Sequence, residues 1–177
     1  MGAYLCQMIE AIKDFYGYNT WANNRLIAKL GELDPVSYNE TYCSGNGTIR
    51  ETLQHLLSTQ WGWLSWFDGS MTVQQGASAK IPDSDVETLE AAKARFKAID
   101  EQTWRYLNSL TDETVFADMP VVMPNRPTTS MPLWKMLMHT ANHATHTRGQ
   151  IVAAIRSTGL APTSFDMFLY TLSEGRA

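Results

Sequence analysis

The sequence predicts an all-α protein, an up-and-down four-helix bundle with a short additional helix near its C-terminal end. Apolar residues recur at three- and four-residue spacings in four long stretches of the 177-residue chain, which is the period of an amphipathic helix. Loops rich in Gly, Pro and polar residues separate these stretches. Neither an internal repeat nor a change in composition divides the chain, so we expect a single domain over residues 1–177.

The first two helices are expected at about residues 7–30 and 49–66. Gly31 and the later Pro35 end the first helix, because glycine favours helix ends and proline prevents continuation. The turn-forming sequence SGNG precedes the second helix. Thr48 and Glu51 have the spacing of a capping box, in which the two side chains bond backbone amides of the first turn.

The third helix is expected at about residues 83–110. The polar segment 68–82 before it is expected to be a loop. Asp83 and Asp85 suit the positive N-terminal end of a helix dipole, so we place the helix start there. After this helix, the proline-rich segment 112–131 allows a short hairpin at an edge.

The fourth helix is expected to begin at a Ser130 cap, with Pro132 in its first turn. It is expected to run to about Thr158, where Gly159 ends it. A short helix at about residues 164–172 then completes the predicted bundle.

Composition and charge exclude several classes of protein. With 44% hydrophobic and 18% charged residues the chain is neither disordered nor fibrous. No apolar run is long enough to span a membrane, and no signal peptide is recognisable. The net charge of -4 argues against nucleic acid as a partner, because phosphate binding needs clustered cations. Cys6 and Cys43 are too few for a disulfide framework, which fits a cytoplasmic protein.

The histidines form the most informative pattern in the sequence. His139, His143 and His146 fall within eight residues of the fourth predicted helix, and His55 is on the second. At about 100° per residue, the three side chains share an arc of roughly 60° on the fourth helix. Gln150 continues the same stripe. The stripe therefore faces the bundle or a cleft, where it can meet His55.

This pattern predicts a divalent metal site. Neutral imidazole is a common ligand for zinc, nickel and iron(II), and facing bundle helices often build such sites. Three ligands would leave one position of the ion open for water or substrate. The alternative is a hydrogen-bonded polar cluster without metal, which would include Asn142, Thr145, Arg148 and Gln150.

Four stretches of the chain resemble the DinB-like (damage-inducible) superfamily of metal-binding four-helix bundles. The run HTANHATHTRGQ at residues 139–150 is similar to the family signature. The other stretches are YNTWANNRL at 18–26, GTIRETLQHLL at 47–57 and PTSFDMFLY at 162–170. They occur in the family's order and span nearly the whole chain.

The resemblance implies a homodimer in which three histidines hold a divalent ion, one from the second helix and two from the last long helix. Relatives include isomerases and transferases that use low-molecular-weight thiols. It therefore implies a metal-dependent enzyme that activates a thiol or water, of transferase or hydrolase type, acting on a small molecule in a stress or damage response. The alternative is a non-catalytic bundle that binds a ligand or forms a dimeric stress protein.

The chain departs from the family pattern at one ligand position. An ungapped comparison assigns His55 and His143 as ligands but places Thr147 where the third histidine is expected. A hydroxyl is a poor ligand for such metals. Either His146 or His139 could replace the missing ligand, or the site could be weakened or empty.

Two further residues are candidates for roles around this site. Arg148 could orient a substrate carboxylate or thiolate, or could form a salt bridge or a helix-end contact. Asp166 could hydrogen-bond a ligand histidine, or could be a first-turn acid of the last helix.

Overall fold

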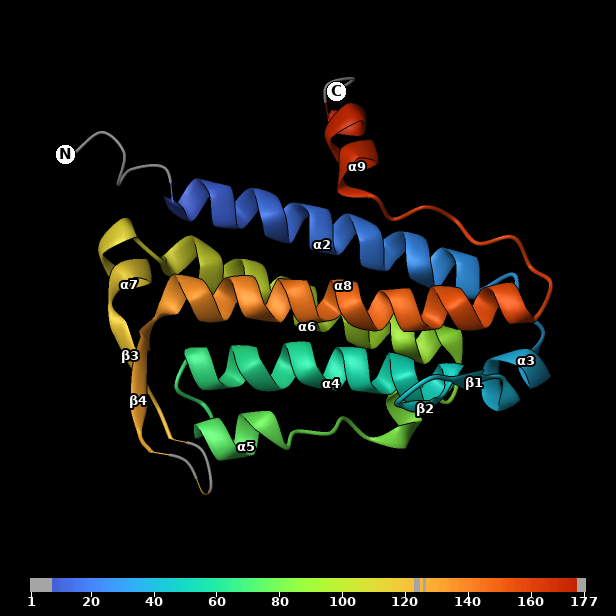
Figure 1. Ribbon diagram of the computed structural model, residues 1–177, viewed down its shortest axis with the longest axis horizontal. Helices are drawn as coiled ribbons and strands as arrows, with labels where there is room; N and C mark the ends of the chain where they lie inside the picture. Colours follow the sequence, from blue (N-terminus) through green and yellow to red (C-terminus); the bar gives the residue numbers. More distant parts are fainter. Residues whose placement is uncertain (1–7, 123–124, 126, 175–177) are drawn as a thin grey trace.

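Four long helices form the body of the protein in the computed structural model, which describes residues 8–122, 125 and 127–174. They are α2 (Met8–Leu30), α4 (Ile49–Phe67), α6 (Leu89–Ser109) and α8 (Leu133–Ser157). The predicted all-α four-helix bundle is therefore confirmed (Figure 1). The predicted helix start at Gln7 and the thiol of Cys6 lie outside the described residues.

The helices do not simply alternate in direction. One core cluster joins the end of α2, the starts of α4 and α6 and the end of α8, represented by Leu30, Ile49, Phe96 and Ile155. A second cluster joins the opposite ends of the same helices. Thus α2 and α8 run one way, and α4 and α6 the other. The connection between α4 and α6 must consequently return along the length of the bundle, as Figure 1 shows.

The second helix begins as expected. Thr48 and Glu51 form the predicted capping box: Glu51 N donates to Thr48 Oγ1 at 3.3 Å, and Thr48 N donates to Glu51 Oε2 at 2.7 Å. At the same end of the bundle, Gly159 follows α8 with a φ of 85°, the left-handed conformation that glycine tolerates best. Both sequence signals therefore set helix ends as predicted.

Two predicted helix starts were wrong. Asp83–Asp85 is only a 3-10 turn, η1, and α6 begins later because the Thr88 hydroxyl accepts a hydrogen bond from Ala91 N at 3.1 Å. Ser130 does not cap α8, because it lies within strand β4. Pro132 takes the N-cap position instead, without a side-chain bond to the helix.

Three short helices occupy segments that the periodicity did not identify. They are α3 (Pro35–Glu40), α5 (Val73–Ala77) and α7 (Asp112–Phe116). The segment 68–82, expected to be a loop, therefore contains α5. Each short helix begins at a side-chain cap, provided by Asp34, Thr72 and Thr111, respectively.

Two antiparallel hairpins complete the bundle. Strands β3 (Asp118–Val121) and β4 (Thr129–Pro132) form the predicted hairpin before α8. Strands β1 (Tyr42–Cys43) and β2 (Gly47–Thr48) pair in front of α4, where only a turn was expected. The short C-terminal helix is α9 (Met167–Glu174), which projects away from the bundle in Figure 1. Among the described helices, none has the length and apolar character required to cross a membrane.

Candidate functional site

His55 of α4 and His143 of α8 face each other across the interface between these two helices. Their Nε2 atoms are 3.1 Å apart, and their rings meet nearly edge to face, with centroids 5.2 Å apart at an interplanar angle of 74°. Both side chains are half-buried. The predicted convergence of imidazoles from the second and fourth long helices is thus present.

Both imidazoles are held in the neutral state. Burial lowers the pKa of His55 below its usual value. The pKa of His143 falls to about 4, mainly through burial and further through the neighbouring histidines. Near neutral pH, one ring of the pair can therefore donate a hydrogen bond to the other, or both nitrogens can serve as ligands.

The separation of the two nitrogens also fits a shared divalent ion. Zinc binds imidazole nitrogens at about 2.0–2.1 Å, so two neighbouring ligands of one ion lie roughly 3 Å apart. Thr147 brings a third polar atom: its Oγ1 is 3.4 Å from His143 Nε2 and also bonds the carbonyl oxygen of His143 at 3.1 Å. The residues thus fit an ion through two nitrogens, with a hydroxyl as the nearest additional donor.

The other two histidines lie on the exposed side of α8. His139 packs edge-on against Trp63 at 5.8 Å, and its ring centroid is 6.3 Å from that of His143. His146 Nε2 lies 3.4 Å from the side-chain nitrogen of Gln150. Within the described parts of the chain, no three His, Cys, Asp or Glu side chains are grouped closely enough to hold a metal.

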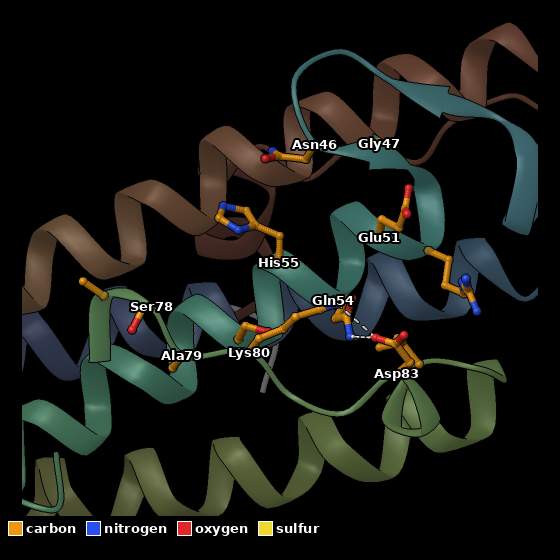
Figure 2. Close-up of a pocket in the computed structure, with 13 residues that line it drawn as sticks. Asn46, Gly47, Glu51, Gln54, His55, Ser78, Ala79, Lys80 and Asp83 are labelled. Atoms are coloured by element: carbon orange, nitrogen blue, oxygen red, sulfur yellow. Dashed lines mark hydrogen bonds and ion pairs between the residues drawn. The ribbon is translucent and has the colours of Figure 1, made fainter. Parts of the chain in front are cut away.

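Gln150 links this helix to the β1–β2 hairpin. Its Oε1 accepts a hydrogen bond of 2.8 Å from Asn46 Nδ2, at the tip of the hairpin. Asn46 and His55 line the same cavity, and Figure 2 shows them on neighbouring elements at one end of it. The hairpin tip therefore forms a wall next to the histidine pair.

Arg148 and Asp166 are placed elsewhere. Arg148 is buried and points toward α2, where it donates to Asn19 Oδ1 at 2.6 Å and Asn23 Oδ1 at 2.8 Å. Asp166 Oδ1 accepts a hydrogen bond of 2.9 Å from Phe168 N at the start of α9. Within the described chain, Asp166 makes no hydrogen bond to a histidine. Among the described residues Arg148 forms no ion pair, so neither the salt bridge nor the helix-end contact predicted as its structural alternative is found. Asp166 immediately precedes α9, next to the predicted first-turn position.

A cavity of about 450 Å³ adjoins His55 on the side of α4 that faces the returning connection. One wall is a face of α4 and the other is the segment from α5 to η1, including Ser78, Lys80 and Asp83 (Figure 2). Sequence reasoning missed this cavity. Its second wall depends on the path of the connection, for which the sequence contains no periodic signal.

Comparisons with known proteins agree with the fold. The sequence model of the DinB family matches residues 8–176. The chain is 25% identical to Protein DinB of Bacillus subtilis (strain 168) over 166 residues, which cover 92% of this chain and 95% of that protein. The crystal structure of a DinB-like protein from Bacillus cereus ATCC 10987 shares the fold, with a TM-score of 0.58 at 18% identity over 88% of this chain and 95% of the other. The family match over nearly the whole chain, together with the bundle, shows that this chain belongs to the DinB family.

Proposed function

We propose that this chain is a metal-dependent enzyme in which His55 and His143 hold a divalent ion next to a substrate cavity. One observation carries the proposal. Imidazole nitrogens from two facing helices lie 3.1 Å apart, and one of these rings lines a cavity of about 450 Å³. This volume is within the range of small-molecule sites. Zinc, nickel and iron(II) are the candidate ions, because imidazole suits all three.

The two histidines are already in the protonation state that metal binding requires. His55 and His143 are neutral near pH 7, so no proton has to leave before their nitrogens can act as ligands. Thr147, His139 and His146 are the candidates for a third donor. A divalent ion, when bound, lowers the pKa of a water or a thiol, which gives a nucleophile near neutral pH. The reaction class is therefore a thiol transfer or a hydrolysis.

Metal analysis and thermal unfolding test this proposal. We expect nickel or zinc to raise the unfolding midpoint by several degrees, because an ion that binds only the folded state stabilises it. His55→Ala and His143→Ala should each abolish this increase and the metal uptake. Asn142→Ala, an exposed residue next to His143 on α8, is the matched control and should behave like the unmodified protein.

The same experiment separates the candidates for the third donor. If His139→Ala or His146→Ala weakens metal uptake at least tenfold, that side chain completes the ligand set. If neither does, Thr147 is the remaining candidate. Absence of metal uptake by the unmodified protein would contradict the proposal.

A second candidate function is a non-catalytic bundle that binds a ligand through the cavity alone. Thr147 favours it, because a hydroxyl stands where the resemblance predicts a histidine. In that case, His143→Ala would leave both the metal content and the unfolding midpoint unchanged. The homodimer and the cytoplasmic location stay predictions for either function.

A further inference from the structure

The cavity beside His55 has a continuous polar wall along one face of α4. Arg50, Gln54 and Ser58 follow one another at four-residue spacing, and Glu51 and His55 form a neighbouring row. Among the described residues, no Phe, Tyr or Trp side chain lines the cavity. These residues favour a small, polar ligand over a large apolar one.

The acidic groups of this cavity are already engaged with other partners. Glu51 Oε2 accepts the 2.7 Å hydrogen bond from Thr48 N, which lowers the pKa of Glu51. Asp83 Oδ1 accepts a hydrogen bond from Gln54 Nε2 at 2.7 Å and forms an ion pair of 3.1 Å with Lys80 (dashed lines in Figure 2). Lys80 is correspondingly paired. Neither carboxylate is therefore bonded to the remaining cation of the cavity.

That remaining cation is Arg50. Its side chain is half-buried, and its charge contributes to lowering the pKa of Glu51 and of Asp83. Within the described part of the chain, however, its guanidinium makes no hydrogen bond and no ion pair. A guanidinium presents five N–H donors in a planar fork that matches a carboxylate. The cavity therefore contains a donor group to which no described side chain is hydrogen-bonded.

The position of Arg50 relative to His55 limits the length of a ligand that reaches both. The two residues are five positions apart on α4, which corresponds to about 7.5 Å along the helix axis. We propose that the cavity binds a small carboxylate whose acid group is held by Arg50 and whose reacting group lies at His55. The placement of the ligand's reacting group at His55 rests on the proposed function. The placement of its carboxylate depends only on Arg50.

A matched series of thiols tests the proposal. Mercaptohexanoate, mercaptohexanol and aminohexanethiol each have six carbons and a terminal thiol. The group at the far end is an anionic carboxylate, a neutral hydroxyl or a cationic amine, respectively. Calorimetric titration of nickel-loaded protein should give about tenfold tighter binding for the carboxylate than for the alcohol, since a charge-assisted pair is gained. The amine should bind most weakly.

Arg50→Gln should remove the preference for the carboxylate and leave binding of the alcohol unchanged. Arg105→Gln, an exposed arginine on α6, is the matched control and should keep the preference. Arg50→Lys, which retains the charge without the planar fork, should keep a reduced preference. The comparison of the three thiols on the unmodified protein needs no variant, so the proposal is tested even if Arg50→Gln fails to fold.

Parallel titrations of metal-free protein with hexanoate and hexanol separate this inference from the proposed function. A carboxylate preference that depends on Arg50 but occurs without metal uptake would support the acid-binding site and contradict the metal-dependent function. Normal metal uptake with equal binding of all three thiols would overturn the inference and leave the metal-dependent function standing.

Discussion

Two polar clusters interrupt the apolar core of the bundle, and both involve α8. On the side facing α4, His55 and His143 have each other as ring partners, and His55 lines an open cavity. On the side facing α2, Arg148 is only 1% exposed, and its side chain is surrounded by acceptors. Arg148 Nη1 bonds Asn19 and Asn23, Nη2 bonds Thr145 Oγ1 at 2.9 Å, and the guanidinium lies over the Tyr18 ring.

The two clusters differ in whether their polar groups remain available to bind a ligand. The Arg148 cluster extends to α4, because Asn23 Nδ2 donates to Gln60 Oε1 at 3.1 Å. It therefore connects three helices through side chains that are buried apart from Thr145. Only Arg148 Nε lacks a partner there among the described residues. The histidine pair, in contrast, is half-buried and keeps nitrogen lone pairs within reach of a ligand. We therefore expect the first cluster to control stability and the second to control binding.

The largest expected effect is on stability, from Arg148→Met. The change removes the shared donor and leaves the oxygens of Asn19 and Asn23 buried without it, which should lower the free energy of unfolding by about 3 kcal/mol. Urea unfolding measures this loss. Arg156→Met, an exposed arginine on the same helix, is the control and should change the free energy by less than about 0.5 kcal/mol. A similarly small effect of Arg148→Met would contradict a structural role for the buried cluster.

The next largest effect is on metal binding, from Thr147→His. An imidazole at this position would add a nitrogen close to His143, so we expect at least about tenfold tighter binding of nickel or zinc. Competition with a chelator indicator measures the affinity. Because Thr147 is fully buried, a larger side chain also costs packing energy, so the metal-free variant should be less stable. An unchanged affinity would show that residue 147 does not face the bound ion.

The smallest effect is a dependence of stability on pH. The pKa of His143 is about 4 in the folded protein, below the usual value of 6.5, so the unfolded chain takes up a proton first as the pH falls. The free energy of unfolding of metal-free protein should therefore be greatest above pH 6.5 and decrease toward pH 4, by about 1 kcal/mol after allowance for solvent screening. Chemical unfolding at several pH values measures this slope. His143→Gln should flatten it, whereas Arg148→Met should leave it in place.

The long helices were predictable because each has enough turns to show an apolar period. The short helix α5 was not, although Thr72 and Gln75 form a capping box like that of Thr48 and Glu51. A five-residue helix is too short to repeat an apolar position several times. Cap residues, examined independently of periodicity, would have identified it.

The site was predictable only in part. Helical spacing and the family resemblance indicated His55 and His143, which the structure brings together. The cavity could not be foreseen, because its outer wall is the connection from α5 to η1. Its path depends on a close backbone approach of α4 and α5: a Cβ on Gly62 would overlap the carbonyl oxygen of Gly76. Neither glycine belongs to a recognisable turn signal. That no described residue is hydrogen-bonded to Arg50 depends in turn on where this connection places Lys80 and Asp83.

The returning connection also places the cavity and the second histidine in different parts of the sequence. The described residues that line the cavity all fall between Asn46 and Val86, a single continuous stretch of the chain. His143, in contrast, is 88 positions away from His55. Exchange of residues 46–86 between relatives would therefore replace the described lining of the cavity and leave α8 unchanged. Ligand selectivity in such a bundle can diverge through mutations within residues 46–86, without any change in α8, the helix that carries His143.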